Sequence, residues 1–185
     1  VGEVEKPGIY PVSGLSSLIN TIISTGGVKQ TGSVRNIQLR RPQRIISVVD
    51  MYDVIVKGHN KDNVYLRHGD VIVVPPIGRT AGIAGEVVRP AIYELKNEQN
   101  IRDIINLSGG LLATAAPKKA QLKRVNRGSD RFELIQVDLT RGGHEQKIAN
   151  GDVLRIYPVN SKIENAIILK GNILEPGSAE WKPGI

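Results

Sequence analysis

An internal repeat is the feature that most constrains how this chain can fold. Four landmarks occur twice in the same order, at an offset of 83 residues for the first three and 82 for the last. Gly2 to Tyr10 returns as Gly85 to Tyr93, and Gly26-Gly27 returns as Gly109-Gly110. Leu39 to Arg41 returns as Leu122 to Arg124, and Gly69-Asp70 returns as Gly151-Asp152. A third copy of the first landmark opens at Gly171. The sequence therefore predicts a first unit (residues 1–80), a second unit (81–160) and the start of a third, truncated unit (161–185).

Each unit predicts the same order of short elements. A first strand, at 1–4 or 83–88, ends at a proline turn, because proline fixes φ at a corner position. A second short strand carries Tyr10 or Tyr93. A helix follows and ends at the Gly-Gly pair, since glycine adopts the left-handed conformation at no steric cost. Further strands are expected at 36–40 and 71–74 in the first unit, and at 120–124 and 153–157 in the second.

The helices are predicted from apolar residues spaced three and four positions apart. The first stripe consists of Leu15, Leu18, Ile19, Ile22 and Ile23, and the second of Ile101, Ile104 and Ile105. Asn100 is the expected N-cap of the second helix.

One helix per unit, with strands before and after it, favours an α+β fold of tandem β-grasp domains. Each would be a small mixed sheet with one helix packed across it. A parallel Rossmann sheet is the alternative, but the single helix and the dense turn signals favour β-grasp. Aromatic residues make up only 4% of the chain, so we expect an aliphatic core.

The motif resembles a known repeat. The pattern runs from Gly2-x-Val4 through Pro7-Gly8 and Tyr10 to Gly26-Gly27, then Leu39-Arg40 and finally Leu66 to Pro75. It is similar to the soluble-ligand-binding β-grasp (SLBB) repeat, and the second copy departs from it at Ala91 and Tyr157. Tandem copies resemble the periplasmic part of the Wza-type outer-membrane polysaccharide export proteins.

This resemblance implies a role in export of capsule or exopolysaccharide. It implies a homo-oligomeric ring as the assembly, polysaccharide as a partner, and a further export partner in the inner membrane. It also implies a periplasmic location, with attachment to the outer membrane through parts that lie outside this fragment.

The motif residues themselves are expected to be structural. These are Gly2, Pro7, Gly8, Tyr10, Gly26, Gly27, Gly69, Asp70, Gly85, Pro90, Tyr93, Gly109, Gly110, Gly151 and Asp152. For the two aspartates the alternative is a functional role, and for the two tyrosines it is stacking on sugar rings. The Gly-Gly pairs follow a helix, whereas a phosphate-binding loop precedes one.

The sequence offers no set of residues for catalysis. The chain has no cysteine, and its histidines His59, His68 and His144 stand apart from one another. We therefore expect no enzyme activity, no cofactor and no metal site. No apolar run approaches the roughly 18 residues that a membrane-spanning helix needs.

Basic side chains gather on and after the strand that follows Gly-Gly, in a chain of net charge +7. The candidates for ligand binding or a subunit seam are Arg40, Arg41, Arg44, Lys123, Arg124 and Arg127. Arginine pairs carboxylates bidentately, including those of acidic glycans. A solvated polar face is the alternative.

Three functions remain open. The first is a non-catalytic module of a polysaccharide export protein, which acts by oligomeric assembly and glycan passage. The second is a soluble-ligand, or glycan, binding module. The third is nucleic-acid binding, which the charge alone suggests; because few aromatic residues lie among the basic ones, no nucleic-acid partner is expected.

Overall fold

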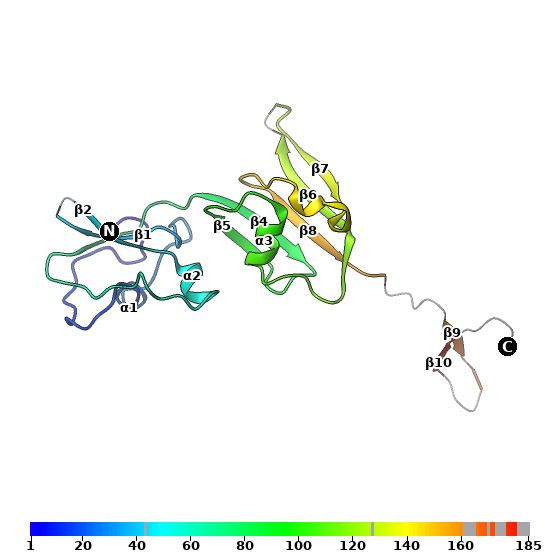
Figure 1. Cartoon of the computed structure of the whole chain (residues 1–185), viewed down its shortest axis with the longest axis horizontal. Helices are drawn as coiled ribbons and strands as arrows, with labels where there is room; N and C mark the ends of the chain where they lie inside the picture. The colour runs from blue at the N-terminus through cyan, green and yellow to red at the C-terminus, as the bar shows by residue number, and fades with distance from the viewer. Residues whose placement is uncertain (43, 127, 161–165, 170, 173–176, 181–185) are drawn as a thin grey trace.

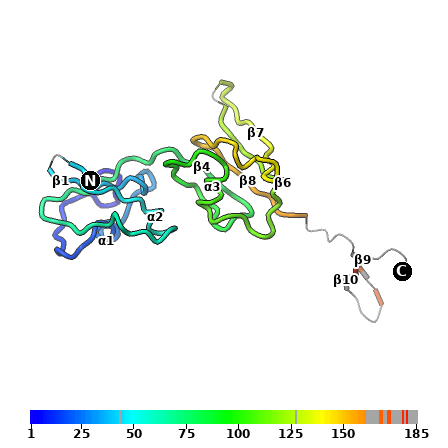
Figure 2. Tube along the Cα trace, viewed as in Figure 1, coloured from blue at the N-terminus to red at the C-terminus, as the bar shows by residue number. Residues whose placement is uncertain are grey.

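The structure is a computed structural model that describes residues 1–42, 44–126, 128–160, 166–169, 171–172 and 177–180. Two sheet-and-helix units follow one another along the chain (Figure 1). A separate two-stranded sheet near the C-terminus stands apart from both (Figure 2).

The first unit has three paired strands and two short helices. In chain order these are α1 (Leu18–Ser24), β1 (Ile37–Arg41), β2 (Arg44–Val49), α2 (Met51–Ile55) and β3 (Val71–Val73). The strand order is β2-β1-β3, with both pairs antiparallel. Strand β2 and helix α2 were not predicted from the sequence, which indicated no element over residues 44–55.

The second unit has a five-stranded mixed sheet. Its elements are β4 (Arg79–Gly85), β5 (Ala91–Leu95), α3 (Ile101–Leu107), β6 (Ala115–Asn126), β7 (Arg131–Val137), the 3-10 turns η1 (Leu139–Arg141) and η2 (Gly143–Glu145), and β8 (Val153–Pro158). The order is β5-β4-β8-β6-β7, in which β4 and β8 run parallel and all other pairs are antiparallel. The predicted α+β fold with small mixed sheets and one main helix is confirmed.

The third landmark copy falls only partly on described residues. Strands β9 (Ala166–Leu169) and β10 (Gly177–Glu180) form an antiparallel pair. Residues 173–176 of the repeated motif, and Trp181 near the end of the chain, lie outside the described residues.

Both main helices begin at a side chain that accepts a backbone N–H, which satisfies a donor that the first turn leaves free. Ser17 accepts from the N–H of Asn20 in α1. The predicted cap Asn100 accepts from the N–H of Asp103 in α3, and the Asp103 carboxylate bonds back to complete a capping box. The predicted stripe of the first helix was too long. Leu15 precedes the helix and Ile23 faces solvent, with 82% and 64% of their surface exposed.

Each unit has its own aliphatic core. Leu18, Ile37 and Leu39 are fully buried in the first, and Ile101, Ile104 and Leu122 in the second. Burying one such side chain stabilises the fold by about 2 kcal/mol. Tyr52 of α2 is unusual, because it packs against the core of the second unit.

The first glycine of the motif is required by a close approach to a strand. Gly2 and Gly85 both have φ of +87°, and a Cβ there would lie 2.2 Å from the Val74 oxygen and 1.9 Å from the Ile156 oxygen. At these points the chain leaves the edge of β3 or β8, and any larger residue would push the two backbones apart.

The two units differ where the second short strand is expected. Ala91–Leu95 forms β5 by pairing with β4, as predicted. The equivalent residues 8–12 of the first unit form no strand, so this part of the prediction was wrong. The expected first strand is reduced there to isolated bridges at Gly2 and Val4. Among the residues that the structure describes, no strand pairs with residues 8–12.

Candidate functional site

A buried ion pair links the Gly-Asp turn to the strand after Gly-Gly. In the first unit, Nε of Arg41 lies 2.7 Å from Oδ1 of Asp70, whose side chain is 3% exposed. The other Asp70 oxygen accepts the backbone N–H of Arg67 at 2.9 Å. Burial alone raises the pKa of Asp70, but the hydrogen bonds from Arg41 and Arg67 outweigh it and hold this pKa below its usual 3.8.

The second unit repeats this arrangement. Nη2 of Arg124 lies 2.6 Å from Oδ2 of Asp152, and that oxygen accepts the Ala149 N–H at 2.7 Å. Arg124 also donates to the Lys147 carbonyl at 2.8 Å. The hydrogen bond to Asp152 raises the pKa of Arg124. In both units the carboxylate closes its own turn and fixes an arginine on the neighbouring strand.

The remaining basic candidates lie differently. Arg40 and Arg44 are exposed, and Arg40 donates to the Gln38 side chain at 2.6 Å. Lys123 is also exposed, with its Nζ 3.9 Å from the centre of the Phe132 ring, a cation–π contact. Arg127 lies outside the described residues. The structure therefore separates the internally paired Arg41 and Arg124 from the outward-facing Arg40, Arg44 and Lys123.

The motif tyrosines lie against their proline turns. The Tyr10 hydroxyl donates to the Lys6 carbonyl, and the Tyr93 hydroxyl donates to the Arg89 carbonyl, both at 2.7 Å. Tyr93 is buried, whereas Tyr10 is 42% exposed. The same bond thus holds the turn in both units, and only the first unit leaves the ring open to solvent.

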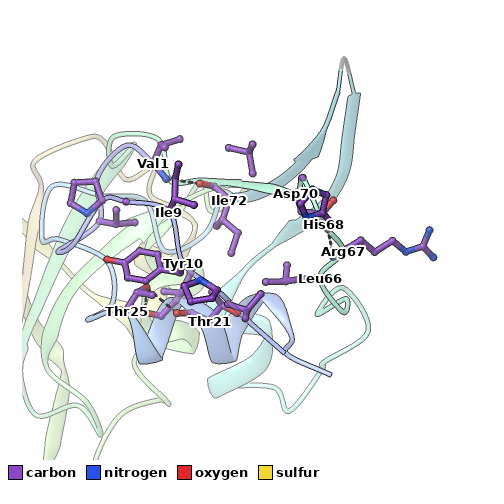
Figure 3. A pocket seen from close by; sticks show the side chains of 18 of the residues that line it. Val1, Ile9, Tyr10, Thr21, Thr25, Leu66, Arg67, His68, Asp70 and Ile72 are labelled. Atoms are coloured by element: carbon purple, nitrogen blue, oxygen red, sulfur yellow. Dashed lines mark hydrogen bonds between the residues drawn. The ribbon is translucent and has the colours of Figure 1, made fainter. Parts of the chain in front are cut away.

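The first unit contains a cavity of about 910 Å³ between β3, α1 and residues 6–14. Figure 3 shows Tyr10 above Thr21 and Thr25 of α1, with Val1 beside Ile72. Its lining is mostly apolar and includes Val4, Ile9, Tyr10, Ile22, Leu66 and Ile72, with His68 and Asp70 at one side. Of these lining residues, Ile9 is fully exposed to solvent.

The second unit has strands where the first has this cavity. Gly2 bridges Val74 as Gly85 pairs with Ile156, so residues 1–2 match the last two residues of β4. Residues 8–12 match β5. In the second unit Ala81, Ile83 and Tyr93 from these strands are buried in the core. The cavity of the first unit thus lies beside residues 8–12, which form no strand.

A polar cluster joins the two units. Arg35 of the first unit is 5% exposed. Its Nε lies 3.1 Å from Oδ2 of Asp50, and its Nη1 lies 2.9 Å from Oε2 of Glu98 and donates to the Glu94 carbonyl at 2.9 Å. Burial lowers the pKa of Arg35, but its bonds to Glu98 and Asp50 outweigh this and raise it. One arginine therefore binds groups from both units.

The buried Glu94 carboxylate completes this junction. It accepts the N–H of Val34 and of Gly78, both at 3.1 Å. The Tyr52 hydroxyl accepts the Glu94 N–H at 3.1 Å, and the Tyr52 ring lies 4.7 Å below Arg35 and edge-on to Tyr93. Burial raises the pKa of Tyr52. These contacts, together with Pro75-Pro76 in the link, fix the orientation of the units.

Within the described ranges no three His, Asp or Glu side chains are grouped so as to hold a metal ion. His68 lies at the cavity edge, and His144 contacts the Leu139 carbonyl at 3.2 Å. In the part of the chain that the structure describes, no helix has the length and apolar character to cross a membrane.

Neither the Arg–Asp pairing nor the junction was predicted from the sequence. The pairing had a signal, because Arg41 and Asp70 recur together as Arg124 and Asp152 at nearly one offset. The junction had no such repeat signal in the sequence, because the contacts of Arg35 with Asp50 and Glu94 occur only once in the described structure.

Comparisons with known proteins agree with the repeat. Two family models, both described as SLBB domain, match residues 1–74 and 80–134. Two curated relatives, both named polysialic acid transport protein KpsD of Escherichia coli, are each 32% identical over 96 residues. That match covers 51% of this chain and 17% of the relative, so the chain spans a small part of these proteins.

Neither the family description nor the name of the relatives denotes a catalyst, in agreement with the prediction of a non-catalytic chain. The two tandem matches together cover more than half of the sequence. The chain belongs to the SLBB-domain family, with two SLBB domains in tandem.

Proposed function

We propose that this chain is a module of a polysaccharide-export protein that oligomerises in the periplasm, at the outer membrane, and lets capsular or exopolysaccharide pass. The observation that carries the proposal is the tandem of SLBB domains in a chain similar to a protein named for polysialic acid transport. The fixed junction between the units supports a scaffolding role, because an assembly needs units that keep one orientation.

The glycan contact in this proposal is the outer face of each sheet. Arg40 pairs with Ile45 and Val71 on the neighbouring strands of the first unit. Lys123 pairs in the same way with Leu134 and Val153 in the second. All four apolar side chains are at least 40% exposed. A cation between apolar residues suits a sugar that carries a carboxylate, since its ring and its charge both find a partner.

The export role is tested with Arg40→Ser and Lys123→Ser together in the full-length protein. We expect surface polymer to fall severalfold while the protein level is unchanged. The control variant carries Arg79→Ser and Arg131→Ser. It loses the same charge from exposed positions that are not among the proposed glycan contacts, and we expect normal export. Normal export by the first variant would contradict the proposed contact.

The assembly is tested by the mass of the full-length protein extracted in mild detergent. A discrete high-order ring supports the proposal, and a monomer argues against it.

A soluble-ligand binding module is the second candidate, and the cavity of the first unit is the observation that favours it. Calorimetric titration with a panel of oligosaccharides should then give a saturable signal. Thr25→Trp, which puts an indole into the cavity, should abolish the signal, whereas Gln30→Trp at an exposed position should not.

A further inference from the structure

A second, smaller pocket opens at the end of β1 in the first unit. Its volume is about 500 Å³, and small-ligand pockets typically measure about 300–1,000 Å³. Its lining combines charged, aromatic and aliphatic side chains from different parts of the unit. They are Gly14, Arg41 of β1, Ile46 of β2 and residues 63–67. This mixed lining suits a ligand that has both charge and apolar surface.

The segment that carries the aromatic side chain is held against the start of α1. The Leu18 N–H donates to the Val64 carbonyl at 3.0 Å, and the Leu66 N–H donates to the Ser16 carbonyl at 2.9 Å. Tyr65 lies between these two bonds, and it is 66% exposed. Its ring is therefore presented to solvent from a backbone that is fixed on both sides.

The cations at this pocket outnumber the carboxylates to which they bond. Arg41 donates through Nε and Nη2 to Asp70, at 2.7 and 3.2 Å. In the part of the chain that the structure describes, neither Nη1 of Arg41 nor the guanidinium of Arg67 meets an acceptor. Figure 3 shows the Arg67 side chain pointing away from the larger cavity. Arg44 lies directly opposite Arg41 in the strand pairing, and like charges in this position repel. A further carboxylate here would be stabilised.

The second unit has neither the ring nor the second arginine. Tyr65 corresponds to Lys147, because each forms an isolated bridge with the N-cap residue of its helix. Two positions further along, Arg67 corresponds to Ala149. The two side chains that could hold a charged ring from opposite sides thus occur together in the first unit alone.

The arginine of the second unit also has one more partner. Arg124 donates to the Lys147 carbonyl at 2.8 Å, whereas Arg41 makes no corresponding bond among the described contacts. The strand pairs differ as well. The register of β1 and β2 shifts after Leu39 and leaves Ile46 as an extra residue, whereas β6 and β7 pair without a shift. Bulges of this kind often lie next to active sites, and Ile46 lines the pocket.

We propose that this pocket binds one acidic sugar residue, with the sugar carboxylate on Arg41 and Arg67 and the sugar ring against Tyr65. A guanidinium group matches the planar geometry of a carboxylate. The negative face of an aromatic ring attracts the C–H groups on one side of a pyranose. The pocket is distinct from the outer-face contact at Arg40, since neighbouring residues of a strand point to opposite faces. The inference rests on the proposed function for the source of the sugar, but not for the geometry of the pocket.

Titration of the full 185-residue chain with methyl glucuronide, followed by nuclear magnetic resonance, tests the site. Backbone amide shifts should move and saturate at residue 41 and over residues 63–67. They should stay unchanged at Lys147 and Ala149, which serve as the control within the same chain. Shifts confined to the strands around Lys123 would place the binding on the outer face and overturn the pocket.

Two further probes separate the charge from the ring. Methyl glucoside, which lacks the carboxylate, should bind roughly tenfold more weakly or worse, because it forms no charge-assisted hydrogen bond. Acetate has the charge without the ring and should also bind more weakly than the glucuronide. Acetate that binds as tightly as the glucuronide would reduce the pocket to a general anion site and refute the sugar.

Variants at the two exposed side chains test their roles without loss of the fold. Arg67→Ala should weaken glucuronide binding roughly tenfold. Tyr65→Ala should weaken it severalfold, whereas Tyr65→Phe keeps the ring and should bind normally. Arg79→Ala removes an exposed arginine elsewhere and is the control. Arg41 is left unaltered, because its loss would also break the pair with Asp70. Unchanged binding by Arg67→Ala and Tyr65→Ala would refute the proposal.

The outcome can be separated from that of the export proposal. The variant with Arg40→Ser and Lys123→Ser should bind the glucuronide in the pocket normally, because neither residue lines it. Binding in the pocket together with normal export by that variant would remove the outer-face contact and leave the pocket. No binding of the glucuronide to the unaltered chain would refute the pocket, whatever the variant does to export.

Discussion

Arg124 and Asp152 form an ion pair in which the carboxylate is almost completely buried and also accepts the N–H of Ala149. Arg41 and Asp70 form the same pair in the first unit. The recurrence means that Gly-Asp is more than a turn signal, because its carboxylate also connects the turn to the neighbouring strand.

Asp152→Ala should destabilise the second unit by about 3 kcal/mol, because it leaves the Arg124 guanidinium and the Ala149 N–H without their acceptor. Thermal or urea unfolding followed by circular dichroism measures this change. Gln136→Ala, at an exposed position of β7 in the same sheet, should change the stability by less than about 0.5 kcal/mol. Equal effects of the two would mean that the pair contributes little.

Stability should fall with acid in a way that depends on Asp70. Its pKa is lowered in the folded state, so its contribution is present above its usual 3.8 and is lost as the pH falls through the lower folded value. Glu98, which also has a lowered pKa, acts in the same direction below its usual 4.5. Unfolding free energies from pH 7 to pH 2 should decline steeply below about pH 4.

Asp70→Asn should be less stable at pH 7 and should show a flatter decline in acid. If the stability of Asp70→Asn declines in acid with the same slope as that of the unaltered chain, then Asp70 does not contribute to the pH dependence of stability.

Arg35→Ala should uncouple the two units. It leaves Asp50 and Glu98 without their shared cation, at a cost of about 3 kcal/mol to the contact. We expect unfolding to separate into two transitions, and small-angle scattering to show a broader range of inter-unit distances. Arg79→Ala removes an exposed arginine from the start of β4 and should preserve a single transition. A single transition in both would assign the rigidity to the proline link instead.

Gly85→Ala should disrupt β4–β8 pairing, because a Cβ there would lie 1.9 Å from the Ile156 oxygen and φ is +87°. Gly110→Ala is the control. Its φ is +98° with no atom within 4 Å, so it should cost only the strain of about 1 kcal/mol for a left-handed alanine. Amide exchange in β4 should accelerate strongly in the first variant and little in the second.

The sequence predicted the parts of the fold that recur. Repeated glycines, the Asn100 cap and the buried stripe from Leu18 to Ile22 specify local structure, so the helices and the α+β class followed from them. The short strand predicted around Ile9-Tyr10 does not form, because strand formation depends on pairing with a neighbouring strand, which a local pattern does not reveal.

The candidate site was less predictable. A run of basic residues in the sequence does not show which of them pairs with a carboxylate. Only the fold shows that Arg41 bonds to Asp70, whereas Arg40 bonds to the Gln38 side chain. The contact of Arg35 with Glu94 joins positions 59 residues apart and occurs once, so neither periodicity nor repetition could identify it.

The shared arginine at the junction also has a consequence for the order of synthesis. A ribosome makes the first unit before the second, so Arg35 and Asp50 emerge when Glu94 and Glu98 do not yet exist. Until then the guanidinium keeps Asp50 and water as its partners and cannot be buried at low cost. The first domain can collapse as it emerges, but its final packing waits for the polypeptide to reach residue 98.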